Sequence, residues 1–169
     1  MTVINPIEIL GFARKQSAHL EQVPSWAPAF SAASAATPLL VQRLDKPDQY
    51  YYIVPFNTGA TVTARLRMNA QTGVYEEGIG IGKHGDQLPP YLTPDAAYRL
   101  IAAKLAAEAK KQKKTGPPPV VVIEPFYGWK PCAQSFSAFL PFYVISSPTR
   151  RYVRVDGKAH EKLTTGAGL

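Results

Sequence analysis

The sequence has a single cysteine, Cys132, and only three histidines, His19, His84 and His160, among its 169 residues. One cysteine excludes a framework of internal disulfides. The three histidines lie far apart in the sequence, without the close spacing of metal ligands that is typical of a zinc site. The sequence therefore indicates neither a metal ion nor another cofactor.

Long hydrophobic runs are also lacking. The longest apolar stretches, residues 120–123 and 139–145, are far shorter than the roughly 20 residues that a helix needs to cross a bilayer. We therefore expect no insertion into a membrane. The first six residues lack the basic leader and apolar segment of a secretory signal, which favours a cytoplasmic location.

No catalytic constellation is recognisable. By residue type, the one pairing of a nucleophile with a base is Cys132 with His160, with Asp156 as a group to orient the histidine. The residues around Cys132 do not resemble the neighbourhood of a thiol-protease nucleophile, and a lone cysteine is usually a packing residue. We therefore expect a protein that is not an enzyme. An enzyme with an unrecognised site around Cys132 and His160 is the alternative.

Charge is unevenly distributed along the chain. Residues 1–81 contain six basic and six acidic residues, whereas residues 82–169 contain thirteen and six, so the second half has the entire net charge of +7. Four of these cations form one short run: Lys110, Lys111, Lys113 and Lys114. This run is either an electrostatic contact for an acidic partner or a solvated helix end, since lysines in a last turn complement the helix dipole.

The first half of the chain predicts a helix followed by strands. Asn5 and Pro6 are typical of a helix start, and Pro24 ends the helix. Strands are then predicted over residues 39–44, 50–56, 60–68 and 74–81, separated by turns rich in Asn, Asp, Gly and Pro. Residues 60–68 alternate strictly, which predicts a half-buried strand with Arg65 and Arg67 facing water.

The same order then begins again. Thr93 and Pro94 predict the start of a second helix, whose last turn is the lysine run. Strands are predicted over residues 120–123, 139–145, 150–155 and 158–163. The fold class is therefore α+β, with two helix-plus-antiparallel-sheet units over residues 1–85 and 86–169, related by duplication. Each sheet is small, so we expect that the two sheets can join into one larger sheet.

These motifs resemble those of PepSY-type domains and of the broader cystatin-like α+β folds. The resemblance rests on the helix start at residues 93–102, on the aromatic strands 50–56 and 142–146, and on the hairpin turns 69–73 and 155–158. It spans most of residues 38–82 and 91–165. It implies a non-catalytic domain, in some members proposed to restrain peptidases or to act as a sensor. The insertion at residues 125–138 departs from this pattern.

The candidate binding residues lie in the second half. Tyr127, Trp129 and Lys130 occupy a segment bounded by prolines, which is either a lid over the sheet or a surface displayed to a partner. Further candidates lie on a predicted strand: Arg150, Arg151 and Arg154. We interpret the protein as a binding or regulatory module for a protein or peptide partner.

The alternative is a nucleic-acid-binding module that uses the lysine run together with the three arginines. Strand alternation is less favourable to it, because Tyr152 shares a face with Arg154 and not with Arg151.

Overall fold

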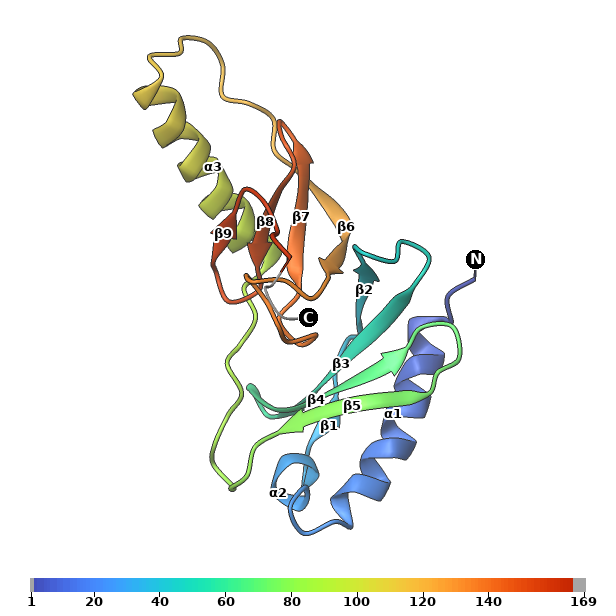
Figure 1. Ribbon diagram of the computed structural model, residues 1–169. Helices are drawn as coiled ribbons and strands as arrows, with labels where there is room; N and C mark the ends of the chain where they lie inside the picture. Colours follow the sequence, from blue (N-terminus) through green and yellow to red (C-terminus); the bar gives the residue numbers. More distant parts are fainter. Residues whose placement is uncertain (1, 166–169) are drawn as a thin grey trace. The chain divides into compact units, whose positions relative to one another are not determined.

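The computed structural model describes residues 2–165, and the chain divides into two compact units, Met1–Pro90 and Tyr91–Leu169 (Figure 1). The boundary follows Pro90, whereas the sequence analysis placed it after residue 85. Both units contain helix and antiparallel strands. The predicted α+β class is therefore confirmed.

The first unit is a helical layer on an antiparallel sheet. Its elements are α1 (Pro6–Glu21), α2 (Ala27–Phe30), β1 (Ser34–Ala35), β2 (Leu39–Arg43), β3 (Tyr50–Thr58), β4 (Thr61–Asn69) and β5 (Tyr75–Gly80). The sheet order is β5-β4-β3-β2. The short β1 pairs with Phe56 and Asn57 near the C-terminal end of β3, whereas β2 pairs with its N-terminal part. The helix start is as predicted, because the Asn5 side chain accepts a hydrogen bond from the Ile7 N–H at 2.8 Å.

Alternate residues of the two central strands form the core of this unit. Phe56 and Leu66 point towards the helices, and the Phe30 ring of α2 meets the Phe56 ring edge-on at 5.1 Å. The other fully or nearly buried members of this core are Ile9, Ala13, Ala29, Tyr52, Val54, Ala64, Met68, Ala70 and Ile81. This burial of apolar area is the main stabilising contribution to the unit.

The prediction that Arg65 faces water is wrong. Arg65 is only 3% exposed, and its guanidinium donates a hydrogen bond to the Pro89 carbonyl oxygen at 2.5 Å. The chain after β5 runs back alongside β4, where the Leu88 N–H donates to the Val62 carbonyl at 2.8 Å. Strand alternation separates two faces but does not show whether a later segment covers one of them. Arg67, on the same face, remains partly exposed as predicted.

The second unit begins with its helix. Its elements are α3 (Pro94–Lys111), β6 (Val122–Trp129), β7 (Phe142–Ser147), β8 (Arg151–Arg154) and β9 (Ala159–His160), and the strands pair in the order β6-β7-β8-β9. The Thr93 hydroxyl caps the helix by accepting from the Ala96 N–H at 3.2 Å. Buried residues of α3 and of the sheet make the core: Ala97, Ile101, Leu105, Tyr143, Ile145, Val153 and Val155.

The structure shortens the predicted insertion at residues 125–138. β6 continues through Pro125 as far as Trp129, so residues 125–129 are strand, and residues 130–141 connect β6 to β7. Pro125 has no N–H to donate, and it lies where the pairing between β6 and β7 is irregular, between Ile123 and Tyr127. Regular pairing resumes at Tyr127, opposite Tyr143. A local irregularity therefore lets the strand tolerate a proline.

Candidate functional site

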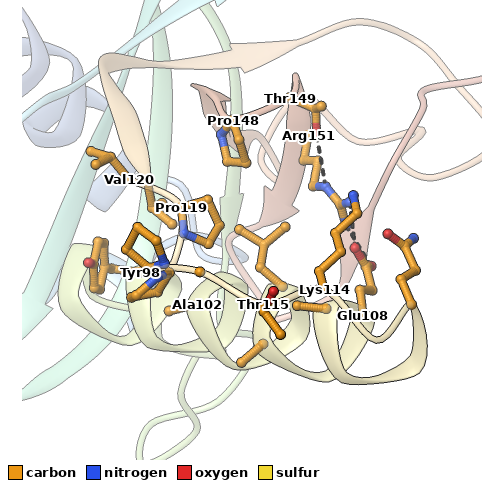
Figure 2. A pocket seen from close by; sticks show the side chains of 18 residues that line it. Tyr98, Ala102, Glu108, Lys114, Thr115, Pro119, Val120, Pro148, Thr149 and Arg151 are labelled. Carbon is orange, nitrogen blue, oxygen red and sulfur yellow. Dashed lines mark hydrogen bonds and ion pairs between the residues drawn. The ribbon is translucent and has the colours of Figure 1, made fainter.

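The second unit has an open groove between α3 and the extended segment that follows it (Figure 2). Its volume is about 920 Å³, which lies within the range of roughly 300–1,000 Å³ typical of ligand sites. The helix wall consists of Tyr98, Ala102, Leu105, Ala106, Glu108, Ala109 and Gln112. The opposite wall consists of residues 114–121, and Pro148, Thr149 and Arg151 complete the lining.

The two walls stay apart for reasons visible in the sequence. Ala102, Ala106 and Ala109 lie on one helical face by their spacing, and their short side chains leave the space beside the helix unfilled. Across from them, Pro117 to Pro119 are three consecutive prolines, each with a backbone angle φ fixed by its ring. A stiff extended wall therefore faces a helix surface of small residues.

The two ends of the groove differ in character. Figure 2 shows Tyr98 and Val120 at one end and Lys114, Glu108 and Arg151 at the other. Tyr98 is 47% exposed and Val120 is 74% exposed, so this end presents apolar side chains to solvent. The groove is thus apolar at the N-terminal end of α3 and ionic at its C-terminal end.

The ionic end is held by a pair between helix and sheet. The Arg151 guanidinium on β8 donates to both Glu108 carboxylate oxygens, at 2.8 and 2.7 Å. This hydrogen bonding lowers the pKa of Glu108 and raises that of Arg151, and the nearby Lys104 and Lys111 also lower the pKa of Glu108. Both groups are therefore charged near neutral pH, and their charges cancel.

The lysine run adds uncompensated charge at this end. Lys110 and Lys111 belong to the last turn of α3, and Lys114 lines the groove after a turn in which Lys113 has a left-handed φ of 50°. All four lysines are exposed, and none forms an ion pair with a residue in the part of the chain that the structure describes. The structure therefore brings one of the four lysines, Lys114, into the lining of the groove and leaves the other three outside it.

The three predicted arginines do not form one basic surface. Arg151 faces α3, where it pairs with Glu108. Arg154 lies on the other face of β8 and donates to both carboxylate oxygens of Asp156, at 2.7 and 2.6 Å. Arg150 is exposed. Two of the three cations are thus already neutralised within the unit.

The predicted aromatic contact residues are largely internal. The Tyr127 ring lies 4.9 Å from the Tyr143 ring beside the core under α3, and burial raises the pKa of Tyr143 above its usual range. Trp129 is 6% exposed, and Lys130, which follows it, is partly exposed. The segment is therefore strand β6, and Trp129 at its end is buried instead of displayed to solvent.

The described residues do not show Cys132, His160 and Asp156 arranged as a catalytic triad. Cys132 is fully buried. Nε2 of His160 is also buried and has no hydrogen-bond partner within residues 2–165, and burial, followed by the nearby Arg154, lowers the pKa of this histidine. The Asp156 carboxylate, expected to orient His160, is instead held by Arg154. Geometry thus assigns Asp156 to an ion pair.

Comparisons with known proteins add no assignment. The chain matches no family model. Curated proteins and solved structures also give no match. Within residues 2–165 no group of three or more His, Cys, Asp or Glu residues is placed to hold a metal ion, and no helix there has the length and apolar character to cross a membrane. The likeness to PepSY-type and cystatin-like domains stays a prediction.

Sequence reasoning missed most of the groove. From the sequence alone, Ala102, Ala106 and Ala109 indicate only a favourable helix, and residues 117–119 indicate only where that helix stops. The sequence nevertheless contains a pattern that could predict a groove. A row of alanines lies on one helical face, and consecutive prolines follow the helix, so a surface of small side chains can lie beside a stiff segment. The missing information was the direction in which the chain turns after Gly116.

Proposed function

We propose that the protein is a non-catalytic binding module and that the groove of its second unit receives a segment of a protein or peptide partner. The observation that carries this proposal is the groove of about 920 Å³ with Tyr98 and Val120 exposed at its apolar end. Exposed apolar patches next to polar rims are typical of interaction sites. A groove open along a helix suits a chain segment, which can lie lengthwise against both walls.

The lining is suited to binding at a low entropic cost. Alanine side chains have no rotamers to restrict, and the ring of each proline has already restricted the backbone of the opposite wall. A partner segment therefore meets a preorganised surface, and less of its binding free energy is spent on ordering the groove.

The proposal is also consistent with the resemblance to PepSY-type and cystatin-like domains, which implies binding without catalysis. Each unit has a helix followed by an antiparallel sheet. We therefore propose that the two units arose by duplication and that the second unit acquired the groove, because its helix is followed by the proline segment that forms the second wall.

The proposal is tested by selecting peptides from a random-peptide display pool on the full chain. The test variant is Ala106→Leu, which places a larger side chain in the groove. The matched control is Ala107→Leu, because Ala107 is the next helical residue, is also exposed and does not line the groove. Leucine favours helix almost as well as alanine, so both variants should fold.

We expect the selected peptides to bind the Ala107→Leu variant as well as they bind the natural chain. Binding to Ala106→Leu should fall by roughly tenfold or more, because a packed interface tolerates little added volume. A pool that binds both variants equally would contradict the proposal, and so would a selection that enriches no peptide.

A further inference from the structure

Building on the proposed function, we infer that the partner segment is acidic at one end: an apolar stretch that lies along the alanines of α3, followed by carboxylates beside Lys114. The inference concerns the chemistry of the occupant and its direction in the groove. It rests on where the unpaired positive charge of the second unit lies.

The second unit has a large charge excess. Residues 91–169 contain twelve Lys and Arg residues and five Asp and Glu residues, whereas residues 1–90 contain seven of each. Three of the five acidic residues already lie beside an arginine: Glu108 and Glu161 beside Arg151, and Asp156 beside Arg154. Little acidic charge therefore remains in this unit to balance the lysine run, so its positive charge is available to attract an acidic partner.

The helix dipole explains only half of the lysine run. Lys110 and Lys111 lie in the last turn of α3, where cations complement the partial negative charge of the helix end. Lys113 and Lys114 lie beyond the last helical residue, and the dipole effect falls off within the last turn. A left-handed turn at Lys113 (φ 50°) precedes Lys114, which lines the groove. Lys114 is therefore the lysine whose position points to a ligand in the groove, and Lys113 is its neighbour in the turn.

The same geometry sets the direction of the occupant. Tyr98 and Val120 lie at the end of the groove opposite to Lys114 (Figure 2). Glu108 also lies at the lysine end, but Arg151 neutralises it, so it does not repel a carboxylate strongly. An apolar side chain gains most near Tyr98, and a carboxylate gains most near Lys114.

An acidic protein segment fits this groove better than a nucleic acid does. A nucleic-acid strand needs cations along its path and aromatic rings for its bases. Here the cations lie at one end, and the aromatic lining residue, Tyr98, lies at the other. Arg151 and Arg154 are held in internal ion pairs. Between the two ends the lining includes the alanines of α3, Leu105 and Pro117 to Pro119, which favour apolar side chains.

The test uses the peptides that the full chain selects and that Ala106→Leu rejects. We expect their sequences to have acidic residues on one side of an apolar stretch. Replacing Lys113 and Lys114 with glutamine should weaken their binding by about fivefold at low salt, since exposed ion pairs are individually weak. The matched control replaces Lys158 and Lys162, which are also exposed in this unit and do not line the groove, and should leave binding nearly unchanged.

The outcomes separate this inference from the proposed function. If Ala106-dependent peptides have no acidic residues, or do not respond to the Lys113 and Lys114 changes, the groove binds peptides and the acidic inference fails. If no Ala106-dependent peptide is selected, both fail. A labelled 12-nucleotide single strand provides the third arm. If it binds through Lys113 and Lys114, and Ala106→Leu does not weaken it, the lysines serve nucleic acid and the inference is overturned.

Discussion

Arg151 on β8 and Glu108 on α3 form a two-point ion pair, with nitrogen–oxygen distances of 2.8 and 2.7 Å. This pair joins the helix to the sheet at the ionic end of the groove. Arg151 also lies 3.8 Å from a Glu161 carboxylate oxygen, on the segment after β9. The pair therefore fixes the C-terminal end of α3, on which the position of the groove depends.

The Arg151–Glu108 pair predicts a pH-dependent contribution to stability. Arg151 lowers the pKa of Glu108 below its ordinary value of 4.5, so the folded protein binds this proton less readily than the unfolded chain does. The contribution is therefore complete above pH 4.5 and is lost as the pH falls through the lower, folded-state pKa. We expect Glu108→Gln to lower the thermal midpoint near pH 7, and the gap from the natural chain to close in acid. A gap that is independent of pH would contradict this expectation.

His160 predicts a second dependence, in a different pH range. Burial, and after it the nearby Arg154 and Lys104, lower the pKa of His160 below its ordinary value of 6.5. As the pH falls, His160 is therefore protonated at a higher pH in the unfolded chain than in the folded protein. Stability from the neutral ring is complete above pH 6.5 and falls as the pH drops towards the folded-state pKa. Between about pH 7.5 and 5.5, the denaturant midpoint of the natural chain should fall more than that of His160→Gln. Parallel curves would show that His160 ionises equally in both states.

The parts of the fold that were predictable are those set by neighbouring residues. Asn5 with Pro6 and Thr93 with Pro94 mark both long helices, and α1 and α3 begin at Pro6 and Pro94. Capping uses atoms within three residues of the helix start, so sequence alone specifies it. The alternation of β4 likewise separated core residues such as Leu66 from the opposite face.

The parts that sequence reasoning missed depend on segments distant in the chain. Arg65 is buried, and its guanidinium meets the carbonyl of Pro89, 24 positions later. Pro125 lies inside a strand because the pairing with β7 is irregular there. The groove exists because the chain reverses at Gly116, whose φ of 132° is in the region that favours glycine, and brings the prolines alongside α3. The secondary-structure propensity of neighbouring residues does not specify contacts between such distant segments.

We expect a side chain at Gly80 on β5 to clash with its neighbours, because the first unit is closely packed there. A Cβ at this position would lie 2.8 Å from the Ala29 Cβ and 3.0 Å from the Trp26 ring. We expect Gly80→Ala to lower the free energy of unfolding by about 1–3 kcal/mol, measured by urea denaturation. Gly82→Ala is the control, since nothing lies within 4 Å of its Cβ, and it should be neutral or stabilising by up to about 1 kcal/mol. Equal effects at both positions would refute the packing argument.

We expect the thiol of Cys132 to react slowly with reagents in the native protein. Cys132 is fully buried, and its sulfur lies 3.8 Å from the Ser135 carbonyl oxygen. A disulfide reagent should label it much more slowly in the native protein than in denaturant, and Cys132→Ala should cost about 1 kcal/mol of stability while groove-dependent peptide binding is retained. Rapid, stoichiometric labelling of the native protein would favour the catalytic alternative.

We expect substitution of Trp129 to reduce stability and to leave peptide binding in the groove unchanged. Trp129 is 6% exposed at the end of β6, and it does not line the groove. Removing a large buried ring leaves a cavity, so Trp129→Ala should lower the free energy of unfolding by roughly 3–5 kcal/mol, and Trp129→Phe by less. Urea denaturation measures both variants. Where Trp129→Ala still folds, groove-selected peptides should bind its folded fraction with unchanged affinity, because the alanines of α3 and the lysines after it are left in place. The opposite result, in which the variant keeps its stability and loses those peptides, would make Trp129 a partner contact and would place the binding surface at β6.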